Sequence, residues 1–380
     1  MSFLLLLLPL ACAPVLAAEA RSPLALTAHY LAESWTTTSG GLRRDTRLLD
    51  MLIVGATLDT AAATSHPGGT VFVNALLHHN TAADLAGETQ AVSNIDFDDG
   101  EHLFEAWYEQ DLGAAGSSLK AGLYDLNSEF DHIAAAGLFL NSNFGIGVDV
   151  SQSGVNGPSV APLSALALRG RWQATPYWQA LAVVLDAVPA APGDTHHNSI
   201  TLSTREGALL AGEIVYGPAP ERRLGIGAWR YTRAVPRLAG PGTAPSQGVF
   251  LHAEQPLRTR PQATWTGFLR LGRAAAAVHP VQYGLEGGLV RTGRIWRDDD
   301  QLGLAVSCAR NGAPWRADLA ADGIASERAE TFIELTWQTR PRPWLALQPD
   351  LQYFVNPGTA PARRNAFFAG LRLRLEWERP

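Results

Sequence analysis

The feature that most constrains the fold of this chain is a period-two alternation of apolar and polar residues, which recurs from Leu42 onward. Successive side chains of a β-strand point to opposite faces, so each such segment predicts a strand with one apolar and one polar face. In the segment 118–125, Leu119 and Ala121 fall on one face and Lys120 and Tyr124 on the other. The same pattern recurs in the segments 333–338, 347–352 and 371–377, and more weakly in 265–271 and 283–289.

The segment 101–110 precedes this example and is joined to it by a glycine-rich link, LGAAGSS (112–118), which predicts a hairpin. Unbroken alternation in this segment would separate two sets of side chains. One face would carry Glu101, Glu105, Trp107 and Glu109, and the other Phe104, Ala106 and Tyr108.

Alternation of this kind fits two architectures, a membrane barrel and a soluble β-sandwich with one face on its core. Two details favour the barrel: the polar face carries full charges in strand after strand, and the apolar face often ends in Trp or Tyr. The 36 glycines and 24 prolines suit the many turns that either fold needs. We therefore predict an all-β fold, a transmembrane antiparallel β-barrel of the outer membrane with about 16 strands, which is wide enough to leave an aqueous channel.

The first residues differ from the rest of the chain. An apolar run, 3–10, followed by small residues up to Ala18, predicts a signal peptide over 1–18 and export of the protein. Residues 19–380 are then expected to form a single barrel domain, with a short segment to about residue 41 before the first strand. No later run approaches the ~18 apolar residues of a spanning helix. A membrane location therefore requires a closed barrel, which leaves no backbone group unpaired in lipid.

Charge and cysteine content exclude other classes. The net charge is −6, with both signs interspersed and no dense basic block, so no nucleic-acid partner is expected. After removal of the signal peptide Cys308 is the one cysteine left, and no disulfide framework can form.

Several segments carry residues typical of a known family. They are SNID (93–96), LFEAWYEQ (103–110), LYDLNSEFD (123–131), LFLNSNFGIG (138–147), AEQPL (253–257), LQPDLQYFVNPG (347–358) and GLRLRLEW (370–377). In this order they resemble the carbohydrate-selective porin family, of the OprB type. The resemblance implies a sixteen-stranded barrel in the outer membrane of a Gram-negative bacterium, through which glucose and related small sugars pass by diffusion.

A sugar is neutral and presents hydroxyls around a ring with apolar faces, so a selective pore needs hydrogen-bonding groups and aromatic surfaces. The candidate pore-lining residues of this kind are Glu105, Trp107, Glu109, Lys120, Tyr124, Asp125, Asn127, Glu129, Arg270, Glu334, Asp350, Arg372 and Arg374.

Two groups of candidates have a structural alternative. The first five could merely hydrate the wall and pair across strands. Asp125, Asn127 and Glu129 could cap a turn. For the three arginines the interpretation is functional: they could form a basic ladder that faces Glu334 and Asp350 across the lumen, and the resulting transverse field would order water and penalise apolar solutes. Asn141, Asn143 and Phe144 are expected to be structural.

No metal, cofactor or catalytic residue is expected. The histidine pairs His78–His79 and His196–His197 are adjacent in sequence, so in a strand their side chains point to opposite faces. Glu105 and Glu109 lack the asymmetric environments that paired carboxylates need for glycoside hydrolysis. The expected partners are small sugars and outer-membrane lipid, with a homo-oligomer left open. The alternative function is a secreted, soluble all-β carbohydrate-binding protein or glycosidase.

Overall fold

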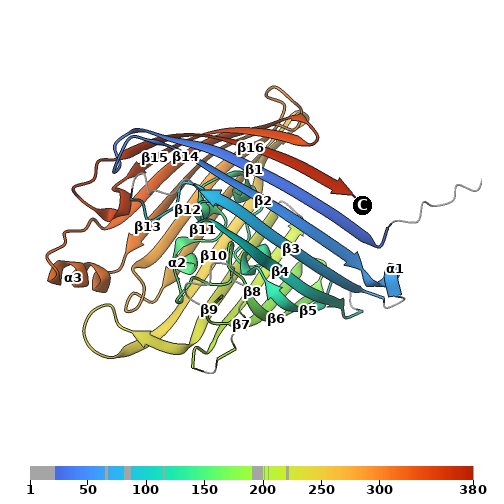
Figure 1. Cartoon of the computed structure of the whole chain (residues 1–380), viewed down its shortest axis with the longest axis horizontal. Helices are drawn as coiled ribbons and strands as arrows, with labels where there is room; N and C mark the ends of the chain where they lie inside the picture. The colour runs from blue at the N-terminus through green and yellow to red at the C-terminus, as the bar shows by residue number, and fades with distance from the viewer. Residues whose placement is uncertain are drawn as a thin grey trace, which may run out of the picture.

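Sixteen antiparallel strands close into one barrel in the computed structural model, which describes residues 22–64, 67–80, 87–113, 116–190, 200, 202–203, 205–219 and 222–379. Each strand pairs with its neighbours in the chain, and β1 (Leu24–Ser39) closes the ring on β16 (Ala366–Arg379) (Figure 1). The predicted fold class and strand number are confirmed. The predicted signal peptide, 1–18, lies outside the described residues.

The remaining strands follow in order around the ring. They are β2 Thr46–Asp59, β3 Gly69–Asn80, β4 Gly100–Asp111, β5 Ser118–Tyr124, β6 Ala165–Thr175, β7 Trp178–Asp186, β8 Ala208–Ala219, β9 Arg222–Pro236, β10 Thr243–Arg260, β11 Ala263–Ala274, β12 Val281–Gly293, β13 Gln301–Asn311, β14 Ala329–Arg342 and β15 Leu345–Val355. The helical segments are α1 Thr60–Thr64, η1 Leu126–Ser128, η2 Ala135–Leu138, η3 Ser142–Phe144, α2 Val148–Ser151, α3 Ala313–Ala321 and η4 Pro357–Thr359. None of the helices in the described ranges has the length and apolar character needed to cross a membrane.

The first strand corrects a prediction, because β1 occupies most of the segment up to residue 41 that was expected to precede the barrel. Its inward side chains include apolar Leu31 and Trp35 beside polar Glu33 and Thr37, all of them buried. The apolar pair packs against the contents of the barrel and so disturbs the simple alternation of an apolar outside and a polar inside.

The two ends of the barrel carry connections of different length. The turns 176–177, 261–262 and 343–344 lie at the end where β1 begins and β16 ends, whereas 81–99, 125–164 and 312–328 connect strands at the other end. In Figure 1 the long connection bearing α3 lies at the left, opposite the C-terminus. Membrane barrels have short periplasmic turns and longer extracellular loops. We therefore name the end with the chain termini periplasmic and the other end extracellular.

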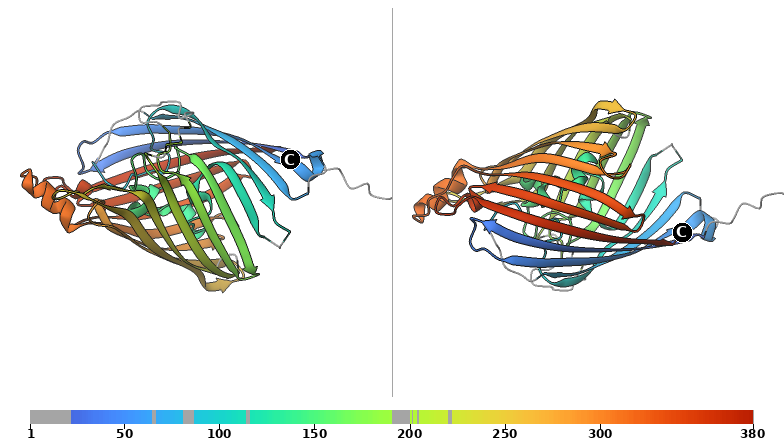
Figure 2. Two further views of the ribbon diagram at one scale, coloured as in Figure 1. Left: turned by 90° about the horizontal axis from the view of Figure 1, so that it is seen from below. Right: turned by 90° about the horizontal axis from the view of Figure 1, so that it is seen from above.

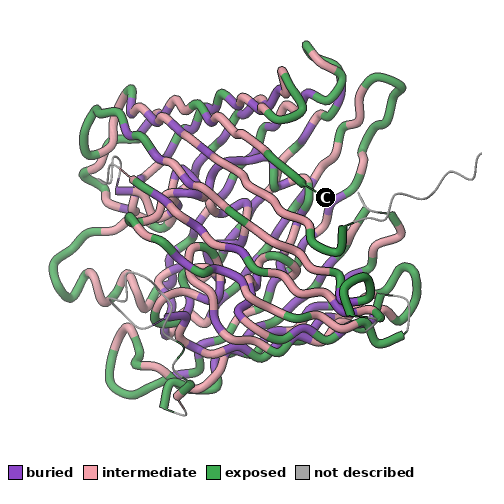
Figure 3. Tube along the Cα trace, turned by 45° about the vertical axis from the view of Figure 1, so that its right-hand side comes forward, coloured by how far each residue is buried: buried purple, intermediate pink, exposed green. Residues whose placement is uncertain are grey.

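Exposed and buried positions alternate along the strands (Figure 3), and one β-bulge breaks the alternation in β4. Asn74 pairs with Glu105, but the next residue along β3 pairs with Leu103, so Phe104 is the additional residue. Phe104 is consequently buried inside, and Glu101 is exposed on the outside. The predicted faces of 101–104 were therefore wrong.

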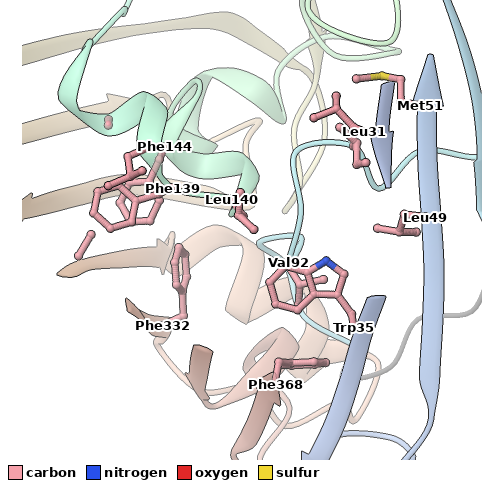
Figure 4. Close-up of a cluster of buried hydrophobic side chains, with 14 of the residues drawn as sticks. Leu31, Trp35, Leu49, Met51, Val92, Phe139, Leu140, Phe144, Phe332 and Phe368 are labelled. Carbon is pink, nitrogen blue, oxygen red and sulfur yellow. The ribbon is translucent and has the colours of Figure 1, made fainter. Parts of the chain in front are cut away.

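The interior is not the wet lumen that the charged strand faces suggested. The segments 87–99 and 125–164 fold inward from the extracellular end, and Figure 2 shows the helical turns of the latter within the ring of strands. Phe139 and Phe144 lie side by side in this segment (Figure 4), and both contact Phe268 of β11, with ring centroids 5.7 and 6.0 Å away. Phe144 also meets Phe332 of β14 edge to face, at 5.5 Å. These contacts fill part of the barrel with a hydrophobic core.

The prediction that Asn141 and Asn143 are structural is confirmed. Asn141 begins η3, where its side chain accepts a hydrogen bond from the backbone N–H of Asn143. The Asn143 side-chain amide donates to Ser307 Oγ at 3.1 Å and to Gln90. The two asparagines thereby tie the two inward segments to each other and to β13.

Candidate functional site

A cavity of about 470 Å³ lies inside the barrel between the inward segments and the strands β1, β2 and β16. Its lining includes His29, Leu31, Met51, Ile53, Asn94, Ile95, Phe97, Asp125, Asn127, Ser142, Gly145, Ile146, Ser151, Val160, Ala161, Arg372, Arg374 and Glu376. Strand register places His29 beside Glu376 and Leu31 beside Arg374 in the periplasmic halves of β1 and β16. The cavity therefore lies on the periplasmic side of the inward segments, and its volume suits a small molecule.

One wall of the cavity is basic. Arg372 is held by Glu33 of β1 and by Asn94 Oδ1 of the segment 87–99. Arg374 lies 3.5 Å from Glu376, which Arg340 of β14 also approaches to 2.6 Å. Glu33 and Glu376 leave part of each guanidinium's donor capacity unused, since one guanidinium carries five N–H donors. This wall can donate hydrogen bonds to neutral oxygen acceptors.

A second wall of the cavity consists of polar residues in the loop after β5. Asp125 accepts a hydrogen bond from the backbone N–H of Asn127 at 3.0 Å, and the Asn127 amide donates to Gly145 O at 2.8 Å. Asp125 therefore caps a turn, as the alternative interpretation expected, whereas Asn127 ties this turn to Gly145; both residues line the cavity. Burial raises the pKa of Asp125 to about 8, and the negative charge of Glu105 adds to the increase. At neutral pH a protonated Asp125 can donate a hydrogen bond as well as accept one.

A second charged group lies near this wall. It consists of five residues from β4, β5, β6 and the C-terminal end of η1. They are Glu109, Lys120, Glu129, Arg169 and Arg171. Arg169 is fully buried and contacts both carboxylates at 2.7 Å, and Lys120 contacts them at 3.5 and 3.6 Å. We call these five residues the β4–β6 charge cluster. Its charges are paired with one another, as the structural alternative for this face expected.

The aromatic candidates contact this cluster. The Lys120 ammonium lies 4.0 Å from the Trp107 ring centroid, and the Tyr124 hydroxyl donates to Glu129 at 2.7 Å. Trp107 in turn donates to Glu105 at 3.0 Å. Within the described residues, the candidates that line the cavity are Asp125, Asn127, Arg372 and Arg374.

The ladder of Arg270, Arg372 and Arg374 facing Glu334 and Asp350 does not form as suggested. Arg270 is buried and contacts Asp131 and Asp149 of the segment 125–164, both at 2.6 Å, and Glu286 of β12 at 3.4 Å. Asp350 receives a hydrogen bond from Gln352, at 3.2 Å. Once the segment enters the barrel its charges lose water, so they need partners on the wall.

Inward glutamates provide hydrogen-bond acceptors for backbone N–H groups of the inward segments. Glu334 accepts from the N–H groups of Leu140 and Asn141 at 2.6 and 3.2 Å. The other glutamates that bind inward backbone are Glu213 (to Asp131 N), Glu254 (to Ala134 and Ala135 N) and Glu330 (to Thr89 and Gln90 N). Sequence reasoning missed these three anchors, and also missed His29, Asn94 and Glu376 in the cavity. The sequence signal that could have indicated the anchors is a glutamate at an inward position in each of several strands.

The described residues contain no group of three or more His, Cys, Asp or Glu side chains placed to hold a metal ion. His78 is buried inside the barrel, with its ring centroid 4.8 Å from that of His102, whereas His79 is exposed. The pair His196–His197 lies outside the described residues.

Comparison with known proteins adds a family and a fold. A family model described as "Carbohydrate-selective porin, OprB family" matches residues 43–377. The high-pH structure of Pseudomonas putida OprB is similar at 19% identity and a TM-score of 0.84, covering 93% of this chain and 94% of that one. The outer membrane channel DcaP of Acinetobacter baumannii is similar at 9% identity and a TM-score of 0.57, covering 93% and 97%. No curated protein sequence matches the chain.

Proposed function

Because the chain belongs to the OprB family of carbohydrate-selective porins, and is thus an outer-membrane sugar porin of a Gram-negative bacterium, we propose that the cavity beside β16 selects the sugar. The observation that supports this proposal is the position of the cavity, which is bounded by both inward segments and by the basic wall. A solute that crosses the barrel must pass the inward segments, so the groups beside them can discriminate between solutes.

The chemistry of the lining suits a sugar. Arg372 and Arg374 supply N–H donors to ring and hydroxyl oxygens, and Asn127 and a protonated Asp125 supply further polar groups on the second wall. Phe97 adds an aromatic surface against which an apolar ring face can lie. Charged groups that are already partly paired bind a neutral solute weakly, which permits rapid release and passive diffusion.

Family and fold indicate a channel rather than an enzyme, and they do not favour the soluble binding protein or glycosidase. Two partner predictions stay as proposals, namely contact of the outward face with outer-membrane lipid and assembly of a homo-oligomer through part of that face.

The proposed site can be tested with two matched arginines. Arg374 lines the cavity and Arg171 belongs to the β4–β6 charge cluster, and both side chains are 27% exposed. We expect Arg374→Gln to change the ratio of glucose uptake to uptake of a similarly sized neutral amino acid in liposomes several-fold. That size corresponds to the loss of about one hydrogen bond, on the order of 1 kcal/mol. Arg171→Gln should leave the ratio unchanged.

The opposite pattern, with a changed ratio for Arg171→Gln alone, would place selection at the charge cluster. Unchanged ratios for both folded variants would mean that neither the cavity nor the β4–β6 charge cluster selects the solute. Far-UV circular dichroism and faster gel migration of the unheated protein establish that each variant has folded.

A further inference from the structure

A groove of about 730 Å³ lies on the barrel wall at the extracellular ends of β8–β11. Its outward lining combines Leu210, Gly212 and Ala228 with three polar side chains, Arg230, Gln247 and Arg273. Gly212 pairs with Ala228 across β8 and β9, so two small residues meet at the groove floor. A side-chain carbon added at Gly212 would lie 3.7 Å from its nearest neighbour, which leaves room above the floor.

The arginines of the groove lie just beyond the lipid-facing apolar surface. The exposed apolar side chains that precede them on their strands are Leu224 and Ile226 on β9, and Leu269 and Leu271 on β11. The next outward charged residues toward the extracellular end are Arg230 and Arg273. At this depth hydrocarbon gives way to lipid headgroups.

Strand register makes the polar groups a continuous row. Arg230 pairs with Gln247, Arg273 pairs with Val249 two residues further along β10, and Arg273 also pairs with Tyr283 of β12. The Arg273 guanidinium lies 5.9 Å from the Tyr283 ring centroid. Exposed Arg310 of β13 pairs with Tyr283 and extends the row.

Arg230, Arg273 and Arg310 form no ion pair with any residue of the described ranges. This contrasts with the inward arginines that line the cavity, belong to the β4–β6 charge cluster or bind the segment 125–164, each of which contacts a carboxylate. Three exposed guanidinium groups at headgroup depth, with no carboxylate partner in the part of the chain that the structure describes, favour an external anion. Phosphate suits them because a guanidinium can donate two parallel hydrogen bonds to it.

We propose that this groove binds a phosphate-bearing lipid of the outer leaflet. Its phosphate lies against Arg230, Gln247 and Arg273, and an acyl chain lies over Gly212 and Ala228 beside Leu210. The apolar floor distinguishes a lipid from a free anion, because a free phosphate would gain nothing from it. The inference does not depend on which solute the channel selects.

Native mass spectrometry of the full-length, detergent-solubilised barrel tests the proposal, with bisphosphorylated lipid A as the probe. Arg230→Gln combined with Arg273→Gln should weaken lipid binding at least tenfold. The matched control, Arg222→Gln combined with Arg260→Gln, removes the same charge at exposed positions of the periplasmic end and should change binding less than twofold. Gly212→Leu fills the floor without changing charge and should also weaken binding.

Millimolar inorganic phosphate should fail to displace the lipid. Equal losses in the two double variants would overturn the proposal, since attraction would then depend on total charge. Complete displacement by phosphate, or unchanged binding by Gly212→Leu, would show an anion site without a place for the acyl chain. A dimer or trimer in the mass spectrum that is lost with Arg230→Gln would assign the surface to a second copy of the chain instead.

Discussion

At the scale of single residues, inward charges act chiefly as partners for the inward segments. Arg270 shows this most clearly, because its guanidinium is buried among three carboxylates, those of Asp131 and Asp149 in the segment 125–164 and of Glu286 on β12. Removal of one partner from a buried ion pair leaves an uncompensated charge away from water. The same applies to Glu334, without which two buried N–H groups would have no acceptor.

We predict that Arg270→Met lowers the free energy of unfolding by about 3–5 kcal/mol, because Asp131, Asp149 and Glu286 lose their common partner. Urea unfolding of the lipid-reconstituted barrel, followed by tryptophan fluorescence, measures the change. Arg43→Met is the control, since Arg43 is half exposed and lies 3.5 Å from an equally exposed Asp45. Such surface pairs contribute about 0–1 kcal/mol. Equal effects of the two variants would show that the buried network is not stabilising.

At the scale of elements, the segment 125–164 decides how much of the barrel is open. Its aromatic residues contact the walls, and its backbone is held by glutamates of three strands, Glu213, Glu254 and Glu334, so it is a built part of the interior rather than a surface loop. A sixteen-stranded barrel without such contents leaves a wide aqueous channel.

We predict that replacement of residues 132–146 by a short Gly-Ser link raises single-channel conductance several-fold in planar bilayers and abolishes the preference for sugars. Deletion of α3, residues 313–321, is the control, because this helix lies at the extracellular end and buries none of its residues. It should leave conductance unchanged. A folded 132–146 variant with the wild-type conductance would mean that another part of the chain limits the pore.

At the scale of the whole molecule, side chains on the outward face must be compatible with lipid, and side chains on the inward face must pack against the inward segments or line the cavity. Leu371 is exposed on the outside of β16, and His29 lines the cavity on the neighbouring strand. Thr336 also points inward, but it is buried and accepts a hydrogen bond from Gln348 at 2.9 Å. An inward position therefore tolerates a long side chain only where the lumen is open.

We predict that Leu371→Arg lowers the free energy of unfolding in lipid by about 2–4 kcal/mol, the cost of a cation near the bilayer midplane. His29→Arg should cost far less, because the cavity can accommodate a hydrated guanidinium. Equilibrium unfolding of both variants in the same lipid provides the comparison. A similar loss in the two variants would contradict the assignment of inside and outside on β1 and β16.

The sequence by itself determined the strand content, the closed architecture and the face that most strand residues occupy. The alternation of Leu119 and Lys120 is a local consequence of strand geometry, so it needs no knowledge of the rest of the chain. Closure follows because an open sheet edge would leave unpaired backbone groups in lipid. Short segments such as 123–131 and 138–147 were sufficient to indicate the family.

The tertiary structure alone decided what the inward side chains contact. Arg270 and Arg374 are both inward arginines at strand positions, yet Arg270 is buried against the segment 125–164 and Arg374 lines the cavity. Asp149, the partner of Arg270, lies more than a hundred residues away in the sequence, and no local pattern records that it returns to that strand. Buried charges and N–H groups must find partners wherever the folded chain brings them, so their roles depend on long-range packing. For that reason the sequence could predict a porin, but it could not tell the residues that line its open cavity from those that hold its contents in place.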